Sequence, residues 1–235
     1  MGRIAQAFVM ACLLTACSGD MTPDQPSTTE TENASVPVAA KTSETEMERS
    51  EHLIVMLGDS LTAGYGLLDE HAVPYVTEQQ LTARGHDISI VNAGVSGDTT
   101  AMGLARFDWS VRSVEPDLVI IALGANDFLG GFSAETAKQN LAQIIERAQA
   151  EKIDVILAGL QPRWPETSDT LEAEYAALYP ELAAEYNVPF YPGFMNGVWN
   201  EPDLLLPDGL HPNRQGVEKM AEGLAGFLDG ELDQP

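Results

Sequence analysis

The sequence predicts an α/β domain in which helices cover both faces of a parallel β-sheet. Five apolar runs of strand length follow one another from residue 53 onward, and they are near-continuous, which is typical of strands buried on both faces. Segments with helical periodicity separate them, and strands that alternate with helices form parallel sheets. The five runs are LIVML (53–57), ISIVN (88–92), LVIIAL (118–123), VILAG (155–159) and VPFY (188–191).

Three segments carry the clearest helical patterns. In residues 133–152 apolar side chains recur every three or four positions, Ser133 suits the N-cap, and Glu135 falls in the first turn. Residues 171–186 are also helical in pattern, and Pro180 is expected to kink or interrupt that helix. Residues 216–230 predict the last helix of the domain.

Residues 1–17 are typical of a secretory leader. One positive charge, Arg3, precedes an apolar stretch too short to span a bilayer as a stable helix. The segment LTAC (14–17) resembles the lipobox of bacterial lipoproteins, which implies cleavage before Cys17 and acylation of that residue. Ser18 in the next position implies an outer-membrane address, so we expect a periplasm-facing lipoprotein of the bacterial cell envelope. The alternative is an ordinary leader cut after Ala16, with Cys17 left as a free thiol.

Residues 18–50 and 51–235 differ sharply in composition. Residues 18–50 are rich in Ser, Thr, Pro and Glu and lack aromatic side chains, so we expect an acidic, disordered tether. Residues 51–235 are long enough for one domain with its own core, and both cysteines lie before it. This domain has 29 acidic and nine basic residues, a formal charge of −20. Such a charge argues against nucleic acid or anionic headgroups as direct partners.

The residues that follow the strands carry the chemistry. Ser60 comes after the first run, Gly97 after the second and Asn126 after the third, while Asp208 and His211 lie beyond the last. In doubly wound sheets, sites form at the carboxyl ends of the strands, near the point where strand order reverses. We therefore expect these five residues to meet at one edge of the sheet.

Together these residue types suit acyl transfer. A serine hydroxyl becomes a nucleophile when a base removes its proton, and His211 can do so if Asp208, three residues earlier, fixes its other ring nitrogen. Pro212 suits the first position of the following helix. The carboxamide of Asn126 and the amides of Gly97 and Ser60 can stabilise an oxyanion.

Each residue taken alone also has a structural explanation. Ser60 suits a helix N-cap, Gly97 a turn, and Asn126 with Asp127 a turn or cap. The other three histidines have no matched carboxylate in a comparable setting, and we expect them to be structural or solvated; they are His52, His71 and His86. The conjunction of five parts, each after a strand and in the right order, favours catalysis.

The same segments resemble the GDSL, or SGNH, hydrolase family. Four blocks match it in order, with the closest likeness to the periplasmic arylesterase, thioesterase I and lysophospholipase L1 subgroup, which also shares LARF (104–107). The blocks are GDSLTAGYG (58–66), VNAGVSGDTT (91–100), ALGANDF (122–128) and DGLHPN (208–213). The likeness runs from about Leu53 to Leu224. The loop at 161–168, which carries Trp164, departs from the subgroup.

The resemblance implies a fold, a mechanism and a set of residues. It implies a three-layer α/β/α sandwich of the flavodoxin-like type with a five-stranded parallel sheet. Ser60 would be the nucleophile, His211 the base and Asp208 its orienting partner, and Ser60, Gly97 and Asn126 would form the oxyanion hole. Gly94 is the alternative second-block glycine, but the SGDT register favours Gly97. No metal or cofactor is implied, and a monomer is expected.

The sequence alone is compatible with several functions. The first is a serine esterase acting on aryl and short- to medium-chain acyl esters, with thioesters and lysophospholipids as further substrates. The second keeps the triad and takes O-acetylated envelope polysaccharide. A third is a tethered envelope binding protein without catalysis. A nucleotide-binding domain is disfavoured, because GDSLTAG (58–64) lacks the lysine and spacing of a P-loop.

Overall fold

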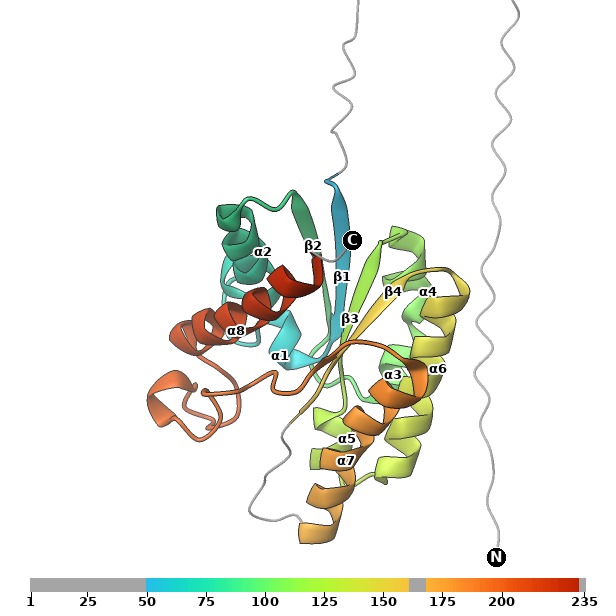
Figure 1. Cartoon of the computed structure of the whole chain (residues 1–235). Helices are drawn as coiled ribbons and strands as arrows, with labels where there is room; N and C mark the ends of the chain where they lie inside the picture. Colours follow the sequence, from blue (N-terminus) through green and yellow to red (C-terminus); the bar gives the residue numbers. More distant parts are fainter. Residues whose placement is uncertain (1–49, 161–167, 233–235) are drawn as a thin grey trace, which may run out of the picture. The chain divides into compact units, whose positions relative to one another are not determined.

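A computed structural model describes residues 50–160 and 168–232, and these ranges form an α/β domain around one parallel sheet (Figure 1). The strands lie in the order β2-β1-β3-β4-β5 and every neighbouring pair is parallel. This confirms the predicted five-stranded sheet. The strands are β1 (His52–Gly58), β2 (Ile88–Gly94), β3 (Leu118–Ala122), β4 (Asp154–Ala158) and β5 (Phe190–Tyr191).

The strands are apolar throughout because their successive side chains enter two different cores. In β1, Val55 and Leu57 pack into one buried cluster, whereas Ile54 and Met56 pack into the other. All four side chains have no exposed surface. Side chains alternate between the two faces of a strand, and a strand covered on both faces therefore needs apolar residues at every position.

Helices form one layer on each face of the sheet (Figure 1). On one face α2 (Val73–Arg84) packs beside α8 (Arg214–Leu232), and both contribute to the Ile54 cluster. On the other face α6 (Ala134–Ala150) and α7 (Asp169–Tyr186) contribute to the Val55 cluster. The three-layer arrangement inferred from the family resemblance is therefore confirmed.

Short helices occupy the connections between strands and long helices. They are α1 (Ser60–Ala63), α3 (Thr100–Ala105), α4 (Phe107–Ser110) and α5 (Ala125–Leu129), with 3₁₀ turns at Asp69–His71, Arg112–Val114 and Pro202–Leu204. None of these was predicted in the sequence analysis, and neither was α2. Within the described ranges, none of the helices is both long and apolar enough to cross a membrane.

Two expectations about prolines were wrong or too strong. Helix α7 continues through Pro180 without interruption, and both Pro180 and Ala176, the residue whose carbonyl loses its helical partner, are exposed. Pro212 does not open the last helix, which begins two residues later at Arg214. Pro212 instead forms an isolated bridge with Leu205, which closes the loop that carries Asp208 and His211. The other long helix behaves as predicted, with Ser133 capping α6.

The strand order reverses between β1 and β3. The chain places β2 on one side of β1 and then crosses to place β3 on the other. The loops that leave the carboxyl ends of β1 and β3 therefore diverge and leave space between them. Ser60 follows β1 and Asn126 follows β3, so the predicted site lies at this switch point.

Candidate active site

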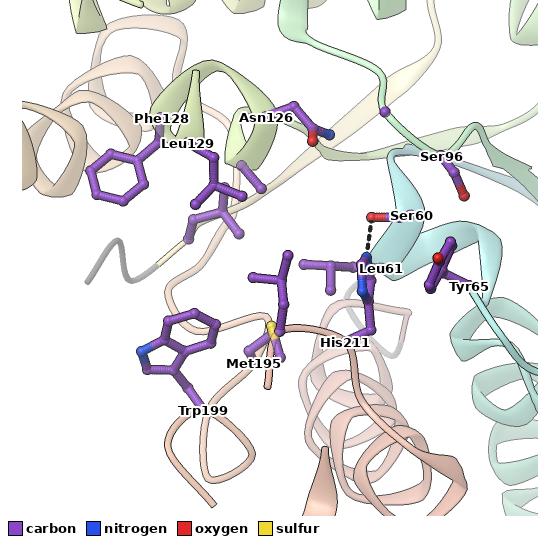
Figure 2. Close-up of a pocket in the computed structure, with 14 residues that line it drawn as sticks. Ser60, Leu61, Tyr65, Ser96, Asn126, Phe128, Leu129, Met195, Trp199 and His211 are labelled. Carbon is purple, nitrogen blue, oxygen red and sulfur yellow. Dashed lines mark hydrogen bonds between the residues drawn. The ribbon is translucent and has the colours of Figure 1, made fainter. Parts of the chain in front are cut away.

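A pocket of about 290 Å³ opens at the carboxyl edge of the sheet (Figure 2). It contains four of the five residues that the sequence analysis placed at strand ends, and Asp208 contacts it through His211. The polar side of the pocket is formed by residues from the β1, β2 and β3 loops and from the loop before α8. Its lining comprises Ser60, Leu61, Tyr65, Ser96, Gly97, Ala125, Asn126, Phe128, Leu129, Leu160, Met195, Trp199, Leu210 and His211.

Ser60 is the first residue of α1, directly after the turn that ends β1. The N-cap of this short helix is Asp59, whose side chain accepts a hydrogen bond of 3.0 Å from the Leu61 amide. The cap is therefore the preceding residue, and the hydroxyl of Ser60 is left to face the pocket. The structural explanation of Ser60 as an N-cap is wrong.

His211 joins Ser60 to Asp208. Its Nε2 lies 2.9 Å from Ser60 Oγ (Figure 2), and its Nδ1 lies 2.7 Å from Asp208 Oδ2. The second carboxylate oxygen of Asp208 accepts hydrogen bonds from the amides of Leu210 and His211, at 2.9 and 3.0 Å. A serine, an imidazole and a carboxylate are thus connected in the order that activates a hydroxyl nucleophile.

The carboxylate of Asp208 is held in its ionised form. Partial burial opposes ionisation, but the two amide hydrogen bonds and the His211 imidazole outweigh it and lower the Asp208 pKa to about 2. The stabilisation that this carboxylate gives the fold is present above the ordinary aspartate pKa near 3.8 and is lost as pH falls toward 2. At neutral pH Asp208 therefore acts as an acceptor for His211.

Tyr65 packs on the face of the imidazole. The ring centroids of Tyr65 and His211 are 4.3 Å apart with an interplanar angle of 29°, and Tyr65 is half exposed. This residue was not predicted from the sequence. It lies only five positions after Ser60, but its role depends on a loop 146 residues further along the chain, so no local pattern indicated it.

Gly97 and Asn126 bring donors to the other side of Ser60. Gly97 has φ of +90°, a conformation that side chains disfavour, and a Cβ there would meet nothing within 4 Å. The glycine is therefore required by its backbone conformation. The alternative glycine, Gly94, packs against the backbone of α1 and is absent from the pocket lining. Asn126 Nδ2 donates to the main-chain carbonyl of Asp98 at 2.9 Å, which leaves its second N–H available.

Buried carboxyl groups lie behind this donor side. Asp127 accepts hydrogen bonds from the Thr100 amide at 2.8 Å and from its hydroxyl at 2.6 Å, and so ties α5 to α3. Burial raises the pKa of Asp59 to about 7, and the nearby carboxylates of Asp98 and Asp127 add to this shift while the Leu61 amide opposes it. The residue beside Ser60 thus holds a carboxyl group whose ionisation is disfavoured by the fold.

The far side of the pocket is apolar. Phe128 and Leu129 come from α5, Leu160 follows β4, and Met195 and Trp199 come from the turns after β5. Figure 2 shows Phe128, Leu129 and Trp199 on the opposite side of the pocket from Ser60 and His211, with Met195 between Trp199 and His211. One end of the pocket therefore holds the polar groups, and the other suits a hydrocarbon chain.

Other residues singled out in the sequence lie elsewhere. His86 lies 2.6 Å from the carboxylate of Asp229, and this pair is at the amino edge of the sheet, away from the pocket, in keeping with a structural role. The segments containing Cys17 and Trp164 are outside the described residues. Across residues 50–160 and 168–232, no group of three or more His, Cys, Asp or Glu side chains is placed to hold a metal ion.

Comparison with known proteins places the chain in a family. Residues 56–219 match the model of the GDSL-like lipase/acylhydrolase family. The chain is 36% identical over 173 residues to the thioesterase 1/protease 1/lysophospholipase L1 of Escherichia coli K12, covering 73% of this chain and 81% of that protein. It is 36% identical to an arylesterase of Vibrio mimicus, covering 76% and 88% of the two chains.

A solved structure agrees with this placement. The crystal structure of AlinE4, an SGNH-hydrolase family esterase, superposes with a TM-score of 0.66 and 38% identity, covering 80% of this chain and all of that one. The chain therefore belongs to the GDSL-like lipase/acylhydrolase family and is a serine hydrolase of the esterase type.

Proposed function

We propose that this protein hydrolyses acyl esters through an acyl-enzyme on Ser60, with His211 as the base and Asp208 as its orienting partner. The observation that carries the proposal is the connected pair of contacts, 2.9 Å from Ser60 Oγ to His211 Nε2 and 2.7 Å from His211 Nδ1 to Asp208 Oδ2. Both lie within the range in which a base can accept the proton of a nucleophile.

The reaction takes place in two halves. Ser60 Oγ attacks the ester carbonyl while His211 Nε2 takes its proton, and the imidazolium then gives that proton to the departing alcohol. Water enters, loses a proton to the same nitrogen and attacks the acyl carbonyl, which releases the acid and restores Ser60. The ionised Asp208 holds Nδ1–H and stabilises the imidazolium in both halves.

The negative charge that develops on the carbonyl oxygen requires donors opposite the base. The amide of Ser60, at the start of α1, the amide of Gly97 and the second N–H of Asn126 all belong to residues of the pocket lining. We assign these three donors to the oxyanion hole. Their value is greatest when they are fixed before the reaction begins.

The substrate class follows from the shape of the pocket and from the relatives. A cavity of about 290 Å³ with apolar walls at one end is at the small end of ligand sites, which suits short- to medium-chain acyl groups. The names of the relatives cover thioesters, lysophospholipids and aryl esters. We therefore propose aryl and short- to medium-chain acyl esters as substrates, with activity toward thioesters and lysophospholipids.

A panel of substrates tests this proposal. Initial rates on p-nitrophenyl esters from C2 to C16 are compared with those on an acyl thioester, a lysophospholipid and acetyl xylan. We expect kcat/KM to peak among the short and medium chains. Hydrolysis of acetyl xylan without hydrolysis of the C6 or C8 ester would instead support the carbohydrate O-acetyl esterase. Absence of turnover on every member would support a binding protein.

The location of the protein is a separate proposal, and it rests on the sequence alone. We propose that Cys17 is acylated and that the domain faces the periplasm from the outer membrane on the tether of residues 18–50. The wild-type protein should then sediment with outer membranes, whereas Cys17→Ala should either become soluble or accumulate unprocessed. Wild-type protein that is wholly soluble and begins with an unacylated residue would contradict this proposal.

A further inference from the structure

We propose that Arg106 and Asp98 are positioning residues that fix the three oxyanion donors in their positions relative to one another. The inference rests on the proposed function, since it assigns a role to groups that act through Ser60, Gly97 and Asn126. Arg106 belongs to the LARF segment (104–107), to which the mechanism above gives no part. Neither Arg106 nor Asp98 lines the pocket.

The guanidinium of Arg106 connects separate parts of the donor side. Its Nε donates to Asp98 Oδ2 at 2.6 Å, one terminal nitrogen donates to the carbonyl of Gly58 at 3.0 Å, and the other donates to Ser110 Oγ at 3.0 Å. Gly58 is the last residue of β1, two positions before Ser60. One side chain on the α3–α4 corner thus fixes the end of β1 relative to the loop after β2.

Asp98 extends the connection to the remaining donors. It directly follows Gly97, so its carboxylate anchors the loop that carries one proposed donor, the Gly97 amide. Its main-chain carbonyl accepts the hydrogen bond of 2.9 Å from Asn126 Nδ2, which orients the carboxamide. The Arg106–Asp98 pair therefore contacts the segments of all three donors, which come from three different strand ends.

The chemistry of this pair suits a positioning role. The two side chains are only 15% and 8% exposed, so neither water nor salt screens the contact strongly. Arginine offers several N–H groups in a planar, rigid fork, and each direction of that fork is used here. Lysine carries the same charge on a flexible stem and cannot reproduce three fixed directions.

A purely structural role makes a different prediction from a positioning role. If the pair only stabilised the fold, its loss would lower the melting temperature and leave turnover of the folded enzyme unchanged. If it positions the donors, turnover falls even in fully folded protein, because displacement of a catalytic group by about 1 Å can cost about a hundredfold in rate. Substrate binding, which uses the apolar end of the pocket, should change little.

The test compares Arg106→Lys and Asp98→Asn with the control Arg112→Lys. Arg112 is half exposed and pairs with Asp108 and Glu151 at 3.5 and 3.6 Å, outside the donor network. Thermal melts first establish the temperature at which each variant is folded. On a p-nitrophenyl ester, we expect kcat to fall about ten- to a hundredfold for the first two variants, with KM within threefold, and to be unchanged for the control.

A mutant cycle with Asn126→Ala shows whether the pair acts through the hole. Once the carboxamide is gone, the Arg106→Lys change should lower kcat by much less than in the wild-type background. Equal factors in both backgrounds, or wild-type kcat for folded Arg106→Lys, would overturn the inference. If Asn126→Ala itself keeps wild-type kcat, the oxyanion hole assigned under the proposed function fails instead.

A milder variant covers the case in which Arg106→Lys does not fold. Ser110→Ala removes one acceptor from the guanidinium and keeps the Arg106–Asp98 contact intact. We expect a two- to fivefold drop in kcat in the wild-type background, and a smaller drop beside Asn126→Ala. If Arg106→Lys does not fold and folded Ser110→Ala keeps the wild-type kcat, the inference is also overturned.

Discussion

The two sides of the active site are held in different ways. On the base side, Asp208 and His211 lie three residues apart in one loop, and the loop's own amides fix the carboxylate. On the side of the proposed oxyanion hole, the donors come from three strand ends, and two of the contacts behind them, Asn126 to Asp98 and Arg106 to Gly58, join residues 28 and 48 positions apart in the chain. One side is built from local turns and the other from long-range contacts.

This difference has energetic and functional consequences. The Asp208 side chain is 39% exposed, so water can replace part of the hydrogen bonding that the loop amides provide. Asp98 and Asp127 are almost fully buried, and buried polar groups are costly when a partner is lost. We expect changes on the base side to alter chemistry with little loss of stability, and changes behind the oxyanion side to alter both.

The largest effect is expected on the base side. His211→Ala removes the proposed base of Ser60, so kcat should fall by at least about 10⁴-fold. The melting temperature should change little, because His211 lies at the pocket and not in a core cluster. Ester hydrolysis at saturating substrate measures the effect. A folded variant with near-wild-type kcat would show that the triad assignment is wrong.

The next largest effect is expected for Asn126 on the oxyanion side. Loss of an oxyanion donor costs roughly 2.7 to 4 kcal/mol of barrier, so Asn126→Ala should lower kcat about a hundred- to a thousandfold with little change in KM. Asn126→Asp places a negative charge against the oxyanion and should be at least as damaging. If both variants melt normally and turn over within about threefold of wild type, Asn126 is not an oxyanion donor.

The buried carboxyl of Asp59 should make stability depend on pH. Its pKa is about 7 in the folded chain against 3.8 when unfolded, so the folded state binds the proton more tightly. The protonated Asp59 therefore contributes fully to the stability of the folded state below pH 3.8, and this contribution is lost as pH rises through 7.

Asp59→Asn removes this dependence and keeps an oxygen for the Leu61 amide. The melting temperature of the variant minus that of wild type should rise between pH 5 and pH 8. This difference in melting temperature should rise by at most roughly 6 to 12 °C, which corresponds to about 3 kcal/mol of unfolding free energy. Melts of both proteins at the two pH values measure it, and the other titrating groups cancel in the difference. The same difference at pH 5 and pH 8 would contradict the assigned burial effect.

The smallest effect is expected for Tyr65, on the base side. An aromatic stack contributes about 0.5 to 1.5 kcal/mol, which corresponds to roughly a two- to twelvefold change in rate. Tyr65→Ala should therefore lower kcat/KM by about that factor, whereas Tyr65→Phe keeps the ring and should stay within twofold. If the two variants lose activity equally, the hydroxyl rather than the stack is responsible.

The same division explains what could be predicted from the sequence. Asp208 and His211 could be predicted as candidates because they lie three positions apart in one loop, and Ser60, Gly97 and Asn126 because each follows an apolar run. Tyr65 and the two proposed positioning residues, Asp98 and Arg106, were not predicted from the sequence, since they contact His211, Asn126 and Gly58 only when distant segments are packed together. The expectation for Pro212 failed because the loop bridge to Leu205 delays the start of α8.

The central claim is that Ser60 is a nucleophile activated by His211, and covalent labelling tests it most directly. The wild-type protein and the variants Ser60→Ala and His211→Ala are treated with a fluorophosphonate and analysed by peptide mass spectrometry. We expect one adduct on wild-type protein, located on Ser60, none on Ser60→Ala, and much slower labelling of His211→Ala. An adduct on a different residue, or an active wild-type esterase that remains unlabelled, would contradict the account.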